Sequence, residues 1–222
     1  VGGKTAINHP QGKNMIGAFH QPKRVFADTN LLTSLPKAEI SNGLSEVIKH
    51  ALINDKKYFD WLEKNMKSII SLKSEELGYA ITRSIEIKAG IVSEDEQEKG
   101  IRKILNFGHT FGHAIELYGN FKEFSHGQSV AIGMLMAMEL SKLTEGFSEE
   151  DLNKSKQLIS TANPDLNFKI TFDEKKLLEN MSVDKKRKGN KLMFVLLERI
   201  GQAKVKADIG ESKIVEAIKS LV

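Results

Sequence analysis

With 222 residues, 40% of them apolar, the chain can form one large domain or two small ones, and because it contains no cysteine, disulfide bonds and thiolate metal sites are excluded. A net charge of +4 suits a phosphorylated or carboxylated ligand, whereas 7% aromatic residues and no basic stripe interleaved with them argue against nucleic acid as a partner. No signal peptide is visible and no apolar run approaches the roughly 18 residues of a membrane-spanning helix, so we expect a cytoplasmic protein without a membrane partner.

The first residues are rich in glycine, proline and asparagine and show little periodicity. Residues 1–22 are therefore predicted to form a functional loop, and Arg24–Asp28 a short strand. The segment Gly2–Thr5 is similar to the end of a phosphate-binding P-loop, but the earlier glycine and a following helix are missing, so that interpretation is rejected. The chain starts with Val1 rather than Met, directly in loop-like sequence, and we expect it to begin inside a larger protein.

From about Ile40 onward the apolar pattern becomes helical, with a predicted first helix that Ser41 and Asn42 cap. Two strands joined at Gly201 and a short amphipathic helix follow near the end. The helices are expected at 41–53, 56–70, 75–92, 102–118, 127–144, 149–162 and 212–221, and the strands at 192–197 and 203–208. The connections are short, so we predict a single bundle-like helical domain with one β-hairpin.

Two histidines lie four residues apart in the predicted helix 102–118, where His109 and His113 share one face. A third, His126, opens the next apolar helical segment, and imidazoles in this arrangement can converge on a divalent metal ion. Glu46 adds a carboxylate of the kind that catalytic zinc sites accept. The alternatives are histidines that are satisfied within the core and, for Glu46, an exposed salt bridge with Lys49.

Cations in two flanking segments could bind an anionic ligand. Lys4, Lys13 and Asn14 lie among glycines, where flexible backbone and positive charge suit phosphates and carboxylates. The basic run 184–189 could place a lysine over the same ligand. The alternatives are ordinary surface charge for the lysines and, for the run, a solvated loop or a nucleic-acid-binding tail.

A polar wall beside the histidines is also predicted. Arg102 and Asn106 precede His109 and His113 at three- and four-residue steps, so a single helix would present all four side chains in line. Lys88, in the preceding predicted helix, is a further candidate for this anion-binding wall, and solvated decoration of a helix face is the alternative.

These segments together resemble 3-dehydroquinate synthase. Residues 106–116, Asn-Phe-Gly-His-Thr-Phe-Gly-His-Ala-Ile-Glu, are the most specific part of the resemblance. The other matching segments are Gly2–Thr5, Asn8–Pro10, Gly12–Phe19, Gly43–Lys49, His126–Gly127 and Asp184–Lys186. The family has an N-terminal Rossmann-like NAD-binding half and a C-terminal helical half. The resemblance thus implies a mainly α fold in which residues 1–35 are a remnant of the N-terminal α/β domain and residues 36–222 form the helical, metal- and substrate-binding domain.

The resemblance also implies roles for individual residues. Glu46, His109 and His126 would bind Zn²⁺ or Co²⁺. The residues that would act on the substrate are Lys13, Asn14, Lys49, Lys88, Arg102, Asn106, His113 and, from the pair 185–186, Lys186. The residues that would contact NAD are Lys4, Lys13, Leu31, Leu32, Thr33 and Ser34. Because the family's glycine-rich pyrophosphate loop lies outside this sequence, we expect the chain alone to bind NAD weakly or not at all.

The activity implied is conversion of 3-deoxy-D-arabino-heptulosonate 7-phosphate to 3-dehydroquinate and phosphate, a step of the shikimate pathway, by a homodimeric lyase. It combines transient NAD-dependent oxidation, phosphate elimination and an intramolecular aldol closure. The alternatives are a related sugar-phosphate cyclase such as an inosose synthase, a metal-dependent polyol dehydrogenase, and an inactive metal-binding or oligomerisation fragment that lacks the NAD domain.

Overall fold

Helices make up most of the chain. The computed structural model describes residues 1–9, 12–168, 170–187 and 192–220, and the side chains of residues 8, 12–15 and 183–187 lie outside this description. The α-helices are α1 (Lys37–Asn54), α2 (Lys56–Ile70), α3 (Ser74–Glu94), α4 (His109–Tyr118), α5 (His126–Glu145), α6 (Glu149–Ala162), α7 (Glu174–Arg187) and α8 (Glu211–Lys219). Two 3₁₀ helices, η1 (Thr29–Ser34) and η2 (Ile101–Asn106), precede α1 and α4. The predicted mainly helical architecture is confirmed.

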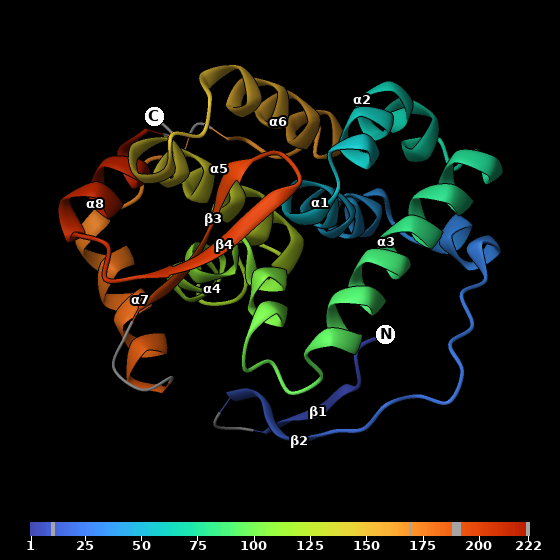
Figure 1. The fold of residues 1–222 in the computed structure, drawn as a ribbon, viewed down its shortest axis with the longest axis horizontal. Coiled ribbons are helices and arrows are strands. Elements are labelled where there is room, and N and C mark those ends of the chain that lie inside the picture. The colour runs from blue at the N-terminus through green and yellow to red at the C-terminus, as the bar shows by residue number, and fades with distance from the viewer. Residues whose placement is uncertain (10–11, 169, 188–191, 221–222) are drawn as a thin grey trace.

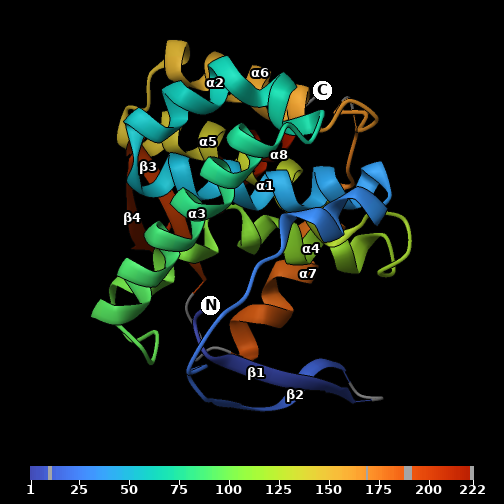
Figure 2. The same cartoon turned by 90° about the vertical axis from the view of Figure 1, so that its right-hand side faces the viewer.

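Helix α5 lies near the centre of the molecule (Figure 1). Every residue of α5 from Ser129 to Ser141 is buried, as expected for a helix that is apolar on all sides. It contacts α1, α4, α6, α8 and the strand β3 (Met193–Arg199). In the view of Figure 2, α5 and α1 form a middle layer, with α2 and α6 on one side and α4 on the other.

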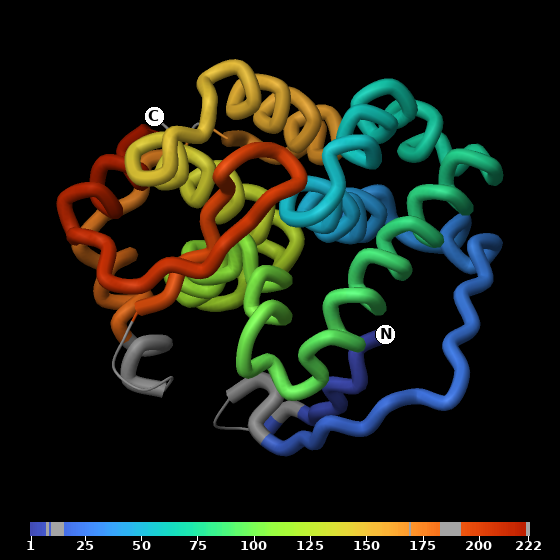
Figure 3. The backbone as a smooth tube through the Cα atoms, viewed as in Figure 1, coloured from blue at the N-terminus to red at the C-terminus, as the bar shows by residue number. Residues whose placement is uncertain are grey.

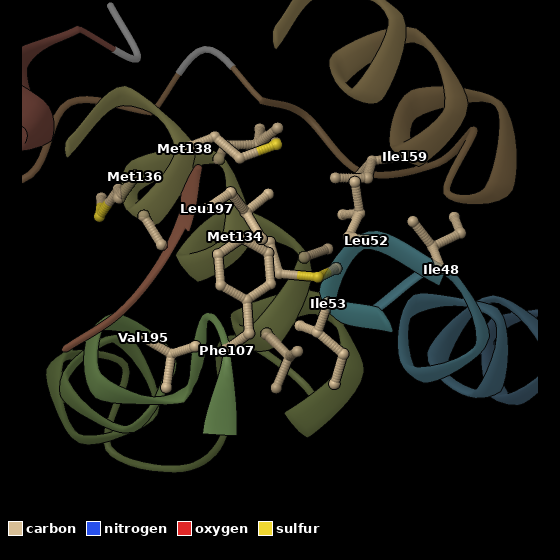
Figure 4. Close-up of a cluster of buried hydrophobic side chains, with 14 of the residues drawn as sticks. Ile48, Leu52, Ile53, Phe107, Met134, Met136, Met138, Ile159, Val195 and Leu197 are labelled. Carbon is tan, nitrogen blue, oxygen red and sulfur yellow. The ribbon is translucent and has the colours of Figure 1, made fainter. Parts of the chain in front are cut away.

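The core is built where α5 meets its neighbours (Figure 4). Side chains such as Phe107, Met134 and Leu52 are fully excluded from solvent. Burying a large apolar side chain stabilises the fold by about 1.5–3 kcal/mol. This contiguous core holds the N-terminal ends of α4 and α5 in place against α1.

Two antiparallel hairpins accompany the helices. The hairpin of β3 and β4 (Gln202–Ala207) turns at Gly201, which has a φ of 86°, and its predicted strands are confirmed. The second hairpin pairs β1 (Lys4–His9) with β2 (Gly12–Phe19), so the predicted loop over residues 1–22 is wrong. The apolar side chains of Ile7, Ile16 and Phe19 in this hairpin are exposed. The alternation that marks a half-buried strand was therefore missing from the sequence.

The chain between the first hairpin and the helical body is extended. The predicted strand Arg24–Asp28 is wrong, because this stretch pairs with no other strand in the described part of the chain and a strand needs a hydrogen-bonded partner. Figure 3 traces it along the edge of the molecule from β2 to the 3₁₀ helix η1. The hairpin β1–β2 lies below the helical body in Figure 2.

Two predicted helix boundaries need correction. Helix α1 starts at Lys37 after Pro36, whose carbonyl accepts from the amide of Ile40, so Ser41 and Asn42 lie inside the helix and do not cap it. The predicted helix 102–118 is interrupted: η2 ends at Asn106, and Gly108 adopts a left-handed conformation with a φ of 76°. Glycine adopts positive φ without steric cost, which lets the chain turn sharply before α4.

Helix α7 was not predicted at all. Asp173 accepts a hydrogen bond from the amide of Lys176, and Leu177 and Met181, four residues apart, are buried. These signals of an N-cap and an apolar face were present in the sequence. The basic run 184–189, for which a solvated loop was one of the interpretations, is helical up to Arg187, and residues 188 and 189 lie outside the description.

No helix among the described residues is both long enough and apolar enough to span a membrane.

Candidate metal centre

Three helices each contribute one side chain to a group whose possible ligand atoms lie close together. Glu46 lies in α1, His109 is the first residue of α4 and His126 is the first residue of α5. Each offers one ligand atom, and these atoms lie within 4.8 Å of one another. A carboxylate oxygen and two imidazole nitrogens form the type of set that holds Zn²⁺ in catalytic sites and leaves a position open for a substrate oxygen.

Glycines allow these helices to approach closely enough. A Cβ atom on Gly127, next to His126, would lie 2.3 Å from the Cα of Asn42 in α1. A Cβ on Gly133 would lie 2.2 Å from the carbonyl oxygen of Gly108, which precedes His109. Any larger residue at either position would push α5 away from α1 or α4. The glycines therefore set the distances between the elements that carry the three side chains.

The ring of His109 is held by its own backbone segment. Its Nδ1 lies 3.1 Å from the carbonyl oxygen of Phe107, and its Nε2 lies 3.6 Å from Oε1 of Glu46. A carbonyl can only accept, so Nδ1 carries the proton in the neutral ring and Nε2 offers a lone pair. Burial, assisted by the charge of Lys49, lowers the pKa of His109 to about 3, which keeps the imidazole neutral and able to bind a metal.

Glu46 is ionised in this environment. Burial alone would raise the pKa of its carboxyl group, but the positive charge of Lys49 and the neighbouring imidazole of His109 overcome this effect and lower the pKa to about 2. The Lys49 ammonium lies 2.5 Å from Oε2. Oε1 is buried and has no hydrogen-bond partner among the described residues. A divalent cation between Oε1 and the imidazoles would satisfy this oxygen, so the donor set fits such an ion.

His126 and His113 complete the group of rings. The ring centroid of His109 lies 5.5 Å from that of His126 and 5.6 Å from that of His113. A hydrogen bond from Nδ1 of His126 to Glu116 raises the pKa of His126 above its ordinary value. His113 is not part of the group whose ligand atoms converge. The residues alone left the choice among three histidines open, and the geometry separates His113 from the other two.

A cluster of lysines lies beside the candidate centre. Lys49 is buried with 4% of its surface exposed. Its pKa is lowered, first by burial and, against the attraction of Glu46, by the charges of Lys88 and Lys4. Lys88 comes from α3 and Lys4 from β1, so the fold brings together three of the predicted cations from distant parts of the sequence.

The residue that links Lys4 to the 3₁₀ helix η2 is Glu98, for which the sequence suggested no role. Its carboxylate accepts a hydrogen bond from the ammonium of Lys4 and another, of 2.7 Å, from Nδ2 of Asn106. Asn106 thus faces the N-terminal hairpin. A glutamate in an irregular segment between two helices carries no pattern that sequence reasoning could have used.

Arg102 departs from the predicted wall. Its guanidinium donates to the carbonyl oxygens of Gly2 and Glu96, both at 2.5 Å, and lies over the ring of Phe19. The idea that one helix aligns Arg102 with His109 is wrong, because the chain turns at Gly108 between them. Arg102 instead fastens the N-terminal hairpin to the helical body.

Several predicted site residues lie apart or outside the description. Leu31, Leu32, Thr33 and Ser34 belong to η1, which contacts α3, and Leu31 is 68% exposed. The side chains of Lys13, Asn14 and Lys186 lie outside the described residues.

A second buried histidine was missed. His50 lies one turn after Glu46 in α1 with 6% of its surface exposed, and both ring nitrogens lack a hydrogen-bond partner among the described residues. Burial, assisted by the charge of Lys49, lowers its pKa to about 3. Sequence reasoning assigned His50 no role, because its burial and the approach of Lys88 from another helix depend on the fold.

We expect His50 to make the metal-free protein sensitive to acid. In the unfolded chain His50 takes up a proton near pH 6.5, while in the folded chain it does so only near pH 3, so stability is lost as the pH falls through this range. This pKa difference implies a loss of about 2 kcal/mol between pH 7.5 and pH 5 from His50 alone. Urea unfolding at the two pH values, with EDTA present, should show a smaller loss for His50→Leu than for the unaltered chain.

The exposed His20 supplies the matched control, and His20→Gln should lose as much stability on acidification as the unaltered chain. Equal losses in all three proteins would show that His50 is not held neutral by the fold.

Comparison with known proteins shows which family the chain resembles. The model of the 3-dehydroquinate synthase C-terminal region matches residues 43–187, and that of the 3-dehydroquinate synthase N-terminal region matches residues 1–42. The 3-dehydroquinate synthase of Bordetella pertussis is 49% identical in an alignment 208 residues long that covers 91% of this chain. The chain spans only 56% of the length of that relative.

Solved structures share the fold. The structure of ValA, a 2-epi-5-epi-valiolone synthase of Streptomyces hygroscopicus with NAD⁺ and Zn²⁺ bound, is similar over 100% of this chain and 61% of its own, with a TM-score of 0.88 and 23% identity. A 2-deoxy-scyllo-inosose synthase complexed with carbaglucose-6-phosphate, NAD⁺ and Co²⁺ is similar over 98% of this chain and 62% of its own, with a TM-score of 0.84 and 27% identity.

Proposed function

The chain belongs to the 3-dehydroquinate synthase family, and we propose that it forms the metal- and substrate-binding part of an enzyme that converts 3-deoxy-D-arabino-heptulosonate 7-phosphate to 3-dehydroquinate and phosphate. The observation that carries the proposal is the convergence of Glu46, His109 and His126, from three helices, beside a cluster of lysines. Both features suit an anionic sugar phosphate. The metal ion would bind one of its hydroxyl groups, and the lysines would bind its phosphate and carboxylate.

We further propose a division of the chain into two parts. Residues 1–35 would be the end of an NAD-binding domain and residues 36–222 the metal- and substrate-binding domain. The support is that the hairpin β1–β2 and the extended segment after it lie outside the helical core, while continuous helical packing begins with α1.

In this proposal Glu46, His109 and His126 hold Zn²⁺ or Co²⁺. The ion, when bound, supplies Lewis acidity that lowers the pKa of a ligated hydroxyl group, and NAD⁺ supplies a hydride acceptor. The neutral imidazole of His109 and the ionised carboxylate of Glu46 are in the protonation states that metal binding requires.

The polar residues around this centre would hold the substrate. Lys49 and Lys88 would neutralise its phosphate or carboxylate. The support is that Lys49 pairs with Glu46 and that Lys88 lies close enough to Lys49 to lower its pKa. The other residues proposed to contact the substrate are Lys13, Asn14, Arg102, Asn106, His113 and Lys186. The guanidinium of Arg102 is buried, and its Nε has no partner among the described residues. The N–H group at Nε can therefore still donate a hydrogen bond to the substrate.

We propose NAD contacts along the N-terminal edge. They would involve Lys4, Lys13, Leu31, Leu32, Thr33 and Ser34. The support is the exposure of Leu31 in η1 and the position of Lys4 within the lysine cluster. The expected homodimer and cytoplasmic location also remain predictions, and light scattering of the purified protein would test the first.

A related sugar-phosphate cyclase is the second candidate. The similarity to the 2-deoxy-scyllo-inosose synthase favours it, since the two share the fold over 98% of this chain. The two functions differ in whether the substrate carries a carboxylate. If the enzyme turned over a hexose 6-phosphate and did not turn over the carboxylated heptulosonate phosphate, the second function would be supported. An inactive metal-binding fragment would turn over neither.

The function is tested by phosphate release. We expect the chain, supplied with Zn²⁺, NAD⁺ and the N-terminal region of the Bordetella relative that it does not match, to release phosphate from the heptulosonate phosphate. Release should require both cofactors and should fall at least tenfold in Lys88→Met, because a charge-assisted contact at a desolvated interface is typically worth about 2–5 kcal/mol. The control is Lys103→Met, because Lys103 lies on the same 3₁₀ helix as Arg102 but does not belong to the lysine cluster. This variant should leave phosphate release unchanged. Absence of phosphate release from a folded, zinc-loaded mixture would contradict the proposal.

A further inference from the structure

Glu116 lies in the second half of α4 and points to the metal-binding region. Its side chain is only 8% exposed, and its Oε1 lies 3.4 Å from Nδ1 of His126. The side chain of His126, in contrast, is 51% exposed. A half-exposed imidazole at the first residue of a helix has several rotamers available in solution, and the buried carboxylate is the group that holds one of them.

The two histidines of the candidate metal centre are held in the same way. The Nδ1 of His109 lies 3.1 Å from the carbonyl of Phe107, and the Nδ1 of His126 lies 3.4 Å from the carboxylate of Glu116. In both rings an acceptor occupies Nδ1 and leaves Nε2 for another partner. Histidines that bind metal ions commonly donate their second N–H to a carboxylate or carbonyl, which fixes the tautomer and the ring orientation.

We propose that Glu116 is a positioning residue that holds His126 ready for metal binding. The inference rests on the proposed metal centre and adds a residue to it. Since His109 begins α4 and Glu116 follows it by two turns, this helix would supply one ligand directly and orient the other. A single rigid element would thereby set the relative placement of two imidazoles that come from different helices.

The carboxylate does this better than a neutral group. As an ion it only accepts hydrogen bonds, so it can pair with Nδ1 only when that nitrogen carries a proton. An amide in its place could present either its oxygen or its NH₂ group, and would allow the opposite tautomer. The negative charge also strengthens the imidazole as a ligand.

The direct test is the Zn²⁺ affinity of the 222-residue chain, measured by competition with a chromogenic chelator. Glu116→Gln should weaken binding about tenfold and Glu116→Ala up to about 100-fold, the range found for such orienting partners. Glu139→Gln is the matched control. Glu139 is also buried, at 6% exposure, but pairs with Lys142 and Lys156, and it lies in α5 roughly 20 Å beyond His126. Its substitution should change the affinity less than twofold.

A second measurement does not depend on metal. In the metal-free chain at pH 8.5, ¹⁵N NMR should report the Nδ1–H tautomer for His126 and a mixture of tautomers in Glu116→Gln. Circular dichroism should show equal helix content in both. A structural role of Glu116 elsewhere in α4 would not change the tautomer of one imidazole.

The outcomes separate this inference from the proposed function. Weaker zinc binding together with the tautomer change supports a positioning role for Glu116. Unchanged zinc affinity in Glu116→Gln, with tight binding by the unaltered chain, would overturn that role and leave the metal centre intact. Failure of the unaltered chain to bind zinc would overturn both.

Discussion

Replacing His109 by alanine should abolish stoichiometric zinc binding. His109 is one of three side chains whose ligand atoms lie within 4.8 Å of one another, and no thiolate is available to replace it, since the chain contains no cysteine. Two remaining protein ligands do not hold Zn²⁺ against dialysis when structural and catalytic sites normally use three or four. Metal analysis after dialysis should therefore give about one equivalent of zinc for the unaltered chain and close to none for His109→Ala.

The matched control is His113→Ala. His113 lies on the same helix with its ring centroid 5.6 Å from that of His109, but it does not belong to the converging group. This variant should keep its zinc. Full zinc retention in His109→Ala would refute the assignment, and zinc loss in His113→Ala alone would move the ligand role to that residue.

Gly133→Ala should cause the largest loss of stability among single-methyl substitutions. The added Cβ would lie 2.2 Å from the carbonyl oxygen of Gly108 and 2.7 Å from the amide nitrogen of Gly112, so two backbones must separate. Overpacking of this kind costs about 3 kcal/mol, while the gain in helix propensity returns at most about 1 kcal/mol. A net loss of about 2 kcal/mol lowers the melting temperature of a chain of this size by about 4–8 °C.

The same substitution should weaken zinc binding, because His109 directly follows the displaced Gly108. Gly78→Ala is the control. Gly78 also lies within a helix, but a Cβ there would have nothing within 4 Å. It should raise the free energy of unfolding by up to about 1 kcal/mol and leave zinc binding unchanged. Equal melting temperatures for the two variants would show that α4 and α5 are not in the tight contact that the structure describes.

Local sequence patterns were sufficient to predict the positions of most helices. The predicted helices 56–70 and 149–162 coincide with α2 and α6. In each, a polar residue accepts a hydrogen bond from the first turn, Asp55 from Tyr58 and Ser148 from Asp151, and apolar residues recur at helical spacing. Such signals are contained in a short stretch of chain. Sequence reasoning therefore identifies them without knowledge of the partner surface.

The candidate ligands were recognisable for a different reason. Histidine and glutamate in a chain without cysteine restrict the metal chemistry, and the motif around His109 indicated the family. The residues alone did not choose among His109, His113 and His126. That choice depends on how α1, α4 and α5 approach one another, which the glycines on α5 permit but a linear pattern does not reveal.

The sequence by itself determined the helical class of the fold, the positions of most helices and the type of ligand that the centre can offer, because hydrogen bonding and apolar periodicity within a helix are local. Only the tertiary structure decided the turn at Gly108, the pairing of β1 with β2, the diversion of Arg102 to Gly2 and the partnership of Glu116 with His126. Each of these depends on a contact between segments that are far apart in the sequence or on different elements. Their energies come from burial and partner geometry, which exist only once the chain has folded.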